Sequence, residues 1–253
     1  MRPALPLALA VASCHAPPPP PTRAPVLTPA VLARHPHDPR AFTQGLEFSR
    51  GRLVEGTGGH GHSSLRTVVP ETGEVLSRVD HPREVYGEGV TVFAGRIYQL
   101  TYRAGRCLVF DAETLAPQGD RRYPGEGWGL THDDRSLILS DGTSALRFID
   151  PETFAERGRL EVTDGGQPVA RLNELERVGD EVYANVWRSN RVARIGLRDG
   201  RVRAWLDLSA LAREVRPSHA EAVLNGVALH PETGDLWVTG KLWPTVFVIR
   251  RGP

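Results

Sequence analysis

The sequence predicts an all-β fold, a five-bladed β-propeller built from four-stranded antiparallel blades. Five segments repeat one pattern of an apolar strand, a turn and a second strand, and their starts are spaced 44, 40, 45 and 52 residues apart. A period of about 45 residues is typical of propeller blades, because each blade needs four short strands and their turns. The repeats begin at Gln44, Glu88, Trp128, Asn173 and Asn225.

Local patterns support each element of this blade. Second strands appear as apolar runs at residues 96–100 and 181–186. Turns rich in proline, threonine and glycine separate the strands, and they recur at residues 70–73, 151–153 and 231–234. One short helix is expected at residues 209–215. Closing the ring requires a strand before the first repeat, around residues 27–33, to complete the last blade.

The N-terminal residues have the pattern of an export signal. A short apolar run at residues 5–12 leads into the string Val-Ala-Ser-Cys, which ends at Cys14 and resembles a bacterial lipobox. The run is too short to cross a bilayer as a helix. We therefore expect an exported protein, periplasmic or held at a membrane by lipid on Cys14; an ordinary signal peptide and an untranslocated tail are the alternatives. The predicted segments are a signal peptide with its lipobox over residues 1–14, a proline-rich linker over 15–25 and the propeller over 26–253.

Composition argues against several classes of partner and site. The net charge is +1 and no basic stripe occurs, which argues against nucleic acid. If Cys14 is lipidated, no internal disulfide can form, and Cys107 lies in an apolar run that predicts a buried thiol. His60 and His62 lie in a glycine-rich stretch and are expected in an exposed loop, without zinc spacing. We expect a monomer.

In a propeller, the repeat also predicts which residues surround the central channel. The innermost strand of each blade borders the central channel, so the five repeat starts surround one axis. A second ring follows at the far end of each second strand, at Thr57, Tyr102, Asp141, Trp187 and Lys241. The rings place a lysine, acids and aromatics at one end of the channel, a composition typical of a ligand pocket. The alternative is a buried network in which these groups satisfy one another, and Asp141 is expected to cap a turn.

Seven strings, in one order along the chain, resemble the plant and bacterial type of glutamine cyclotransferase. The strings are FTQGL at 42–46, YGEG at 86–89, GEGWGLT at 125–131, LNELE at 172–176, ANVW at 184–187, VLNG at 223–226 and TGKLWP at 239–244. The resemblance implies a five-bladed propeller with a pocket at one mouth of its channel. Two departures occur: Tyr102 stands where the family often has tryptophan, and residues 55–58 alter a first-blade Glu-Ser-Thr-Gly segment.

The resemblance also implies a reaction, in which the α-amine of an N-terminal glutamine attacks its own side-chain amide and ammonia leaves. No external nucleophile is needed, so the lack of a Ser/His/Asp or Cys/His arrangement is no difficulty. The predicted catalytic residues are Glu88 as proton shuttle and Lys241 and Asn173 as donors to the amide oxygen, with Gln44 a third candidate donor. The predicted substrate-binding residues are Gln44, Tyr102, Trp128, Trp187 and Asn225. The expected partners are peptides and proteins with N-terminal glutamine.

No cofactor and no catalytic metal are expected. Glu174 and Glu176 share one face of a predicted strand, where they are expected to pair with arginines or to bind a structural divalent cation. Two other functions stay open. One is a non-enzymatic propeller that binds peptides or glycans. The other is a calcium-dependent hydrolase such as a lactonase, with Glu88, Asn173 and Asn225 supplying part of the calcium site.

Overall fold

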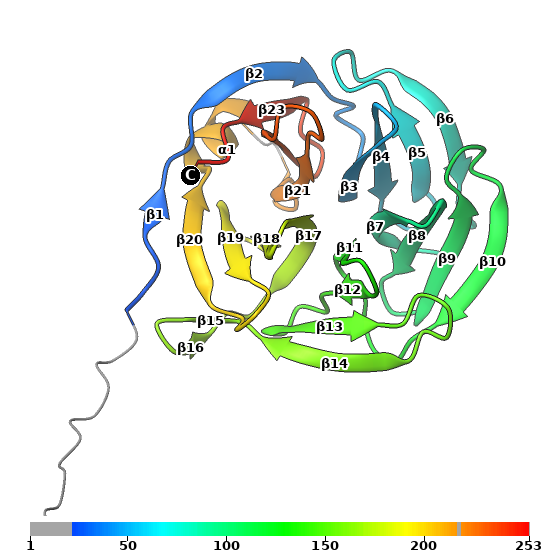
Figure 1. The fold of residues 1–253 in the computed structure, drawn as a ribbon. Coiled ribbons are helices and arrows are strands. Elements are labelled where there is room, and N and C mark those ends of the chain that lie inside the picture. The colour runs from blue at the N-terminus through cyan, green and yellow to red at the C-terminus, as the bar shows by residue number, and fades with distance from the viewer. Residues whose placement is uncertain (1–21, 217–218, 253) are drawn as a thin grey trace, which may run out of the picture.

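The predicted class is confirmed by a computed structural model, which describes residues 22–216 and 219–252. Five sheets stand round a common axis, and each contributes four antiparallel strands that form one blade. Figure 1 shows β3, β7, β11, β17 and β21 nearest the axis, and β6, β10, β14, β20 and β2 at the periphery.

The strands of each blade follow one another along the chain from the axis outwards, except in the last blade. Blade 1 holds β3 (Thr43–Ser49), β4 (Arg52–Thr57), β5 (Ser64–Val68) and β6 (Val75–Asp80). Blade 2 holds β7 (Gly87–Phe93), β8 (Arg96–Thr101), β9 (Arg106–Asp111) and β10 (Pro117–Arg122). Blade 3 holds β11 (Leu130–His132), β12 (Leu137–Leu139), β13 (Ala145–Ile149) and β14 (Glu156–Glu161). Blade 4 holds β17 (Leu172–Val178), β18 (Glu181–Val186), β19 (Arg191–Gly196) and β20 (Val202–Asp207). Blade 5 holds β21 (Leu224–Leu229), β22 (Leu236–Gly240), β23 (Thr245–Ile249) and β2 (Val31–Pro36).

Ring closure comes from the N-terminal part of the chain. Strand β2 pairs antiparallel with β23, from Val31 opposite Ile249 to Pro36 opposite Thr245. The prediction that a strand before the first repeat completes the last blade is therefore confirmed, although β2 overlaps the expected residues 27–33 only over residues 31–33. The earlier β1 (Val26–Leu27) instead pairs in parallel with β20 of blade 4.

The predicted signal peptide, Cys14 and most of the predicted linker lie outside the described residues. Within residues 22–25, the Ala24 amide donates to Asp164 Oδ1 at 2.7 Å, and the Trp205 amide donates to the Pro25 carbonyl at 2.8 Å. Asp164 belongs to a small hairpin, β15 (Thr163–Asp164) with β16 (Gln167–Pro168). Among the described residues, no helix has the length and apolar character needed to cross a membrane.

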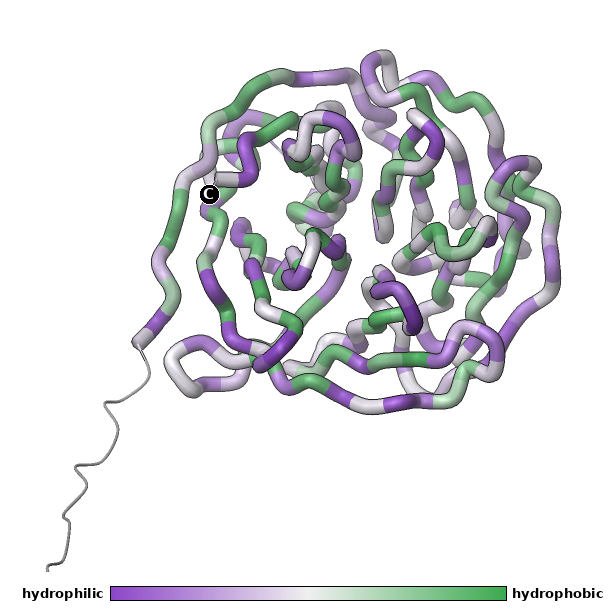
Figure 2. Tube along the Cα trace, viewed as in Figure 1, coloured by the Kyte–Doolittle hydropathy of each residue, from purple (hydrophilic) through white to green (hydrophobic). Residues whose placement is uncertain are grey.

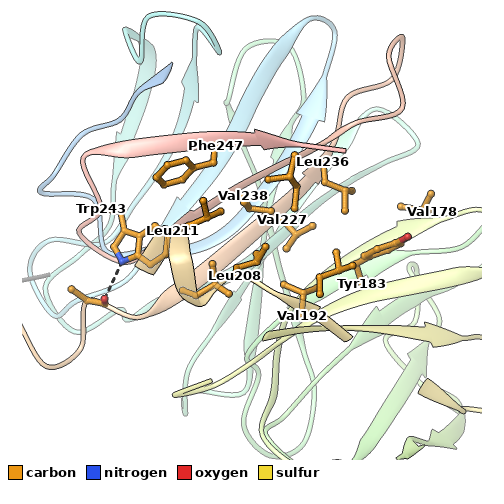
Figure 3. Packing of buried hydrophobic residues seen from close by; sticks show 14 residues of the cluster. Val178, Tyr183, Val192, Leu208, Leu211, Val227, Leu236, Val238, Trp243 and Phe247 are labelled. Carbon is orange, nitrogen blue, oxygen red and sulfur yellow. Dashed lines mark hydrogen bonds between the residues drawn. The ribbon is translucent and has the colours of Figure 1, made fainter. Parts of the chain in front are cut away.

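The short helix predicted at residues 209–215 is confirmed as α1 (Ser209–Val215). It packs Leu211 into a cluster between blades 4 and 5, beside Phe247 and Trp243 (Figure 3). The Trp243 indole also donates to the Ala222 carbonyl at 2.9 Å, so its one polar atom is satisfied. Burial of such side chains stabilises a fold by about 1.5–3 kcal/mol each. The outer strands are more hydrophilic, as β14 beside β13 shows in Figure 2.

The inner strands approach one another closely at the axis, and glycine follows the repeat start in four of the five blades. A Cβ on Gly129 would lie 1.9 Å from the carbonyl oxygen of Asn173, and one on Gly45 would lie 2.3 Å from the amide nitrogen of Val90. Both contacts are with backbone of the next blade, so neither can be relieved by moving a side chain. In blade 4 the corresponding residue is Glu174.

Three carboxyl groups bind the inner strands to one another. Both oxygens of Glu174 accept backbone N–H groups, from Leu46 of blade 1 at 3.3 Å and Val227 of blade 5 at 2.8 Å. Glu176 accepts from the Leu229 amide of blade 5 at 3.0 Å. Glu47 of blade 1 accepts, with one oxygen, from the Thr91 hydroxyl and the Val92 amide of blade 2. The predicted pairing of Glu174 and Glu176 with arginines is wrong for the described residues, since backbone amides take that place.

Burial raises the pKa of each of these groups. The pKa of Glu47 rises to about 7, while the pKa values of Glu174 and Glu176 rise well above the ordinary carboxyl range. The cause is loss of hydration, which disfavours the charged form. The hydrogen bonds from the backbone oppose this shift and do not cancel it.

Gly129→Ala should destabilise the fold by about 1–3 kcal/mol or more, because the added methyl group overlaps the Asn173 carbonyl. The measurement is the urea unfolding midpoint. Gly158→Ala is the matched control, since a Cβ there meets nothing within 4 Å, and we expect a change of about 1 kcal/mol or less. Equal midpoints for the two variants would contradict the close approach at the axis.

Glu47→Gln should flatten the dependence of stability on pH. The unfolded chain releases the Glu47 proton near pH 4.5, and the folded chain releases it only near its raised pKa of about 7. The contribution of Glu47 to stability is thus full below about pH 4.5 and is lost as the pH rises to about 7. Unfolding free energies at about pH 5 and about pH 8 should differ less in the variant than in the parent.

Glu71→Gln is the control for this comparison, because Glu71 is exposed on a turn. An identical pH dependence in the parent, E47Q and E71Q proteins would show that Glu47 titrates as an exposed carboxyl does.

Candidate active site

A pocket of about 230 Å³ opens at the end of the channel where the inner strands begin. Ten residues from all five blades and their connections line it: Phe42, Gln44, Tyr86, Glu88, Tyr102, Trp128, Asn173, Trp187, Glu221 and Lys241. Seven of the eight predicted site residues are among them. The exception is Asn225, which is fully buried behind the pocket wall.

Irregularities in the inner strands aim the repeat-start side chains at this pocket. The pairing of inner and second strands shifts register around Gln44, Glu88, Asn173 and Asn225. A β-bulge of this kind re-aims a side chain that strict alternation would direct elsewhere. The second-ring residues arrive from the opposite direction, since Tyr102, Trp187 and Lys241 lie at or just beyond the ends of second strands.

Glu88 is the buried carboxyl of the pocket. It accepts a hydrogen bond of 3.1 Å from the Gln44 amide nitrogen, and its side chain is almost completely enclosed. Burial raises the pKa of Glu88 well above its ordinary value; the positive charge of Lys241 opposes the rise, and the carboxylate of Glu126 adds to it. A carboxyl in this state can carry a proton near neutral pH.

Asn225 orients the group that contacts Glu88. Its amide nitrogen donates to the Thr43 carbonyl at 2.9 Å and to Gln44 Oε1 at 3.4 Å. With its oxygen bound to Asn225, the Gln44 amide must present its nitrogen to Glu88. Asn225 therefore lies one layer behind the cavity surface that it was predicted to form.

Lys241 is the only lysine in the 253 residues, all other basic side chains being arginine or histidine. It is buried, and its Nζ lies 4.8 Å from the centre of the Phe42 ring. Its backbone amide donates to the Val223 carbonyl at 2.9 Å, whereas Nζ makes no hydrogen bond and no ion pair with any other described residue. Burial lowers the pKa of Lys241, and the charges of Glu88 and Glu221 oppose the fall. An amine that no hydrogen bond engages is free to meet an incoming oxygen.

Aromatic side chains form the walls. The rings of Trp128 and Trp187 meet edge to face with their centres 5.6 Å apart, and those of Tyr86 and Tyr102 lie 5.7 Å apart. The Trp128 indole donates to Glu126 Oε2 at 3.0 Å. The wall is therefore apolar towards the cavity while its indole nitrogen is satisfied on the outside.

Asn173 has an unsatisfied acceptor in this pocket. Its side chain is buried, and Oδ1 has no hydrogen-bond partner among the described residues. The backbone carbonyl of the same residue is occupied by the Ser140 hydroxyl at 2.7 Å. A buried unpaired acceptor costs free energy, which a ligand N–H group can recover.

Three lining residues were not predicted from the sequence. Phe42 and Tyr86 each stand two positions before a repeat start, an offset that could have revealed them as a third ring. The same position in blade 3 holds Glu126, the partner of Trp128. Glu221 comes from the long connection between β20 and β21, which no repeat position predicts.

Comparison with known proteins decides the family. The family described as Glutamine cyclotransferase matches residues 5–251. The chain belongs to the glutamine cyclotransferase family. It is 39% identical over 226 residues to the glutaminyl-peptide cyclotransferase of Arabidopsis thaliana, which covers 87% of this chain and 70% of that protein. A crystal structure of Myxococcus xanthus glutaminyl cyclase superposes with a TM-score of 0.84 at 37% identity, covering 90% of this chain and 97% of that one.

Several other predicted features of this glutamine cyclotransferase family member lie outside the pocket lining. Asp141 caps its turn as predicted, accepting from the Thr143 amide at 3.1 Å, and Thr57 bonds the Ser64 hydroxyl at 2.8 Å. Cys107 is a buried thiol, also as predicted. The histidines at 60 and 62 are exposed.

A calcium-dependent hydrolase would need several carboxylates that converge on one ion. Within residues 22–216 and 219–252, no group of three or more histidine, cysteine, aspartate or glutamate side chains could hold a metal ion. Asn225, which was expected to supply part of such a calcium site, uses its nitrogen on Thr43 and Gln44 instead.

Proposed function

We propose that this chain is a glutaminyl-peptide cyclotransferase, which converts N-terminal glutaminyl residues of peptides and proteins to pyroglutamate and releases ammonia. The observation that carries the proposal is the joint burial of Glu88 and the single lysine, Lys241, in one aromatic pocket. Family membership and the identity to the Arabidopsis thaliana protein support it.

The reaction exchanges one bond for another within the substrate. The α-amine nitrogen bonds to the side-chain amide carbon, a tetrahedral intermediate forms, and the bond from that carbon to the amide nitrogen breaks. One proton must leave the attacking amine and one must reach the departing nitrogen, which leaves as ammonia. The protein has to hold the chain curled, move a proton and stabilise the oxyanion.

Glu88 performs the proton transfer. Its raised pKa makes the carboxylate a stronger base than an exposed glutamate, so it can take the proton of the amine and return it to the leaving nitrogen. The Gln44 amide, fixed by Asn225, holds one carboxyl oxygen at 3.1 Å and thereby sets the direction of the other.

Lys241 stabilises the oxyanion. The Gln44 nitrogen is engaged by Glu88, and Lys241 is the charged donor that lines the pocket, so Lys241 is the donor best able to serve the developing charge. Asn173 Oδ1 then accepts an N–H of the substrate. Of the three candidate donors, we thus propose Lys241 for the oxyanion, Gln44 as the partner of Glu88, and Asn173 as an acceptor in place of the donor role first expected.

The aromatic walls hold the glutamine in the curled form. Trp128 and Trp187 form a corner against which the methylene groups pack, and Tyr86 and Tyr102 form the facing surface. Orientation of this kind can supply up to about 7–11 kcal/mol of the barrier. We propose no catalytic cofactor. Export and a lipid on Cys14 remain proposals based on residues 1–14, and a monomer is likewise proposed.

Incubation with a glutamine-initiated peptide tests the function. We expect ammonia release and loss of the mass of one ammonia from the peptide. An asparagine-initiated peptide of otherwise identical sequence is the control, because its chain is one carbon too short for this ring. Binding of the glutamine peptide without any ammonia would favour the non-enzymatic propeller.

Glu88→Gln should lower kcat by about 10²–10⁴-fold, since an amide cannot shuttle the proton. Substrate binding should change little, because glutamine keeps the size of the side chain and its contact with Gln44. Turnover and peptide affinity are measured on the same preparation. Near-normal turnover in E88Q would remove Glu88 from this role.

Lys241→Ala should lower kcat by about 10²–10³-fold with a smaller change in KM, because its charge acts on the oxyanion. Lys241→Arg is the companion variant that keeps the charge and changes its geometry. A loss confined to KM in K241A would place Lys241 in substrate anchoring.

A further inference from the structure

Two arginine–glutamate ion pairs stand at the mouth of the pocket, and we call them the rim pairs. Arg103 Nε donates to Glu126 Oε1 at 2.8 Å, and Arg188 Nη2 donates to Glu221 Oε1 at 2.5 Å. Arg103 lies in the loop after β8, and Glu126 lies in the connection from blade 2 to blade 3. Arg188 lies in the loop after β18, and Glu221 lies in the connection from blade 4 to blade 5.

Each rim pair also contacts an aromatic wall. The Arg103 guanidinium lies 4.7 Å from the centre of the Tyr102 ring, and that of Arg188 lies 4.8 Å from the centre of the Trp187 ring. Glu126 accepts the indole N–H of Trp128 as well, and Glu221 lines the pocket. The rim pairs are therefore continuous with the surface that would hold a substrate.

The two charges of each pair are not equally accessible. The side chains of Arg103 and Arg188 are 70% and 53% exposed, whereas those of Glu126 and Glu221 are 35% and 32% exposed. Both oxygens of Glu126 are occupied, by Arg103 and by Trp128. A guanidinium has five N–H donors in a planar fork, and the bond to glutamate uses only part of them. The rim thus offers donors and positive charge to solvent.

A peptide bound by its first residue must cross this rim. Under the proposed function, the pocket of about 230 Å³ holds the N-terminal glutamine. An extended chain advances about 3.3 Å per residue, so the next two residues then pass over the mouth. Carboxylates are the groups that the arginine fork binds best, often through two parallel hydrogen bonds.

Resting on the function proposed above, we propose that Arg103 and Arg188 form a subsite for the two residues that follow the N-terminal glutamine. The ligand class is an acidic side chain at these positions. The glutamates of the rim pairs keep the arginines over the aromatic walls, and the exposed edges of the arginines bind the substrate carboxylate.

The expected preference is modest and depends on salt. An exposed pair of this kind is worth about a two- to fivefold ratio in kcat/KM. The ratio should fall towards one as ionic strength rises, because the charges face solvent. A purely steric role of the two arginines would not respond to salt.

The test compares the substrates Gln-Glu-Glu-Ala, Gln-Lys-Lys-Ala and glutamine amide, which ends at the reacting residue. In the parent protein, kcat/KM for the Glu peptide should exceed that for the Lys peptide by about two- to fivefold. The double variant R103Q/R188Q should lose this ratio, and R103K/R188K, which keeps both charges, should retain most of it. Dividing each value by that for glutamine amide removes any effect on the reacting residue.

The outcomes separate the subsite from the function. Ammonia release with equal rates for the Glu and Lys peptides in the parent protein would overturn the subsite alone. An equal fall for all three substrates in R103Q/R188Q would show that the arginines only support the walls, and would also overturn it. Absence of ammonia from every substrate would overturn the proposed function and the subsite with it.

Discussion

The structure depends on how the backbone N–H and carbonyl groups of the inner strands find hydrogen-bond partners at the propeller axis. Each inner strand pairs on one side only, so the other edge presents backbone N–H and carbonyl groups to the channel. Glycines such as Gly45 and Gly129 let the strands come close enough for contact. Side chains of neighbouring blades then supply the missing partners, as Glu174 does for blades 1 and 5 at once. The ring is closed by side-chain hydrogen bonds across the axis as well as by β2.

The surroundings of each buried carboxyl group distinguish one that holds the fold together from one that can act on a substrate. Glu174 and Glu88 are both buried in the channel, and the pKa of each is raised by loss of hydration. Glu174 accepts a backbone N–H with each oxygen and is not among the residues that line the pocket, so its role is to link blades 1 and 5. Glu88 receives one hydrogen bond from a side chain that is itself oriented, and it faces an open cavity. What separates the two is the access of Glu88 to the cavity, and burial alone would not tell them apart.

Much of the fold and the pocket could be predicted from the sequence, because the repeat indicates both the number of blades and the residues that face the axis. Equivalent blade positions occupy equivalent places round an axis, so Glu88 and Lys241 could be brought together across the whole length of the domain. Strand alternation placed Glu174 and Glu176 on one face, and both accept amides of β21, from Val227 and Leu229. Their partners could not be predicted in this way, because backbone amides of a neighbouring blade take the place of the expected arginines. Glu221 could not be found in this way, because its connection between blades 4 and 5 has no counterpart in the other repeats.

Because every other basic side chain is arginine or histidine, the pocket lysine can be observed spectroscopically on its own. Protein grown with isotopically labelled lysine would carry one labelled side chain, and that side chain is Lys241. The resonance of its Nζ would report the protonation of the amine, both in the free protein and with a product bound. No second lysine contributes to the spectrum, so magnetic resonance can observe the amine of the pocket without background signals.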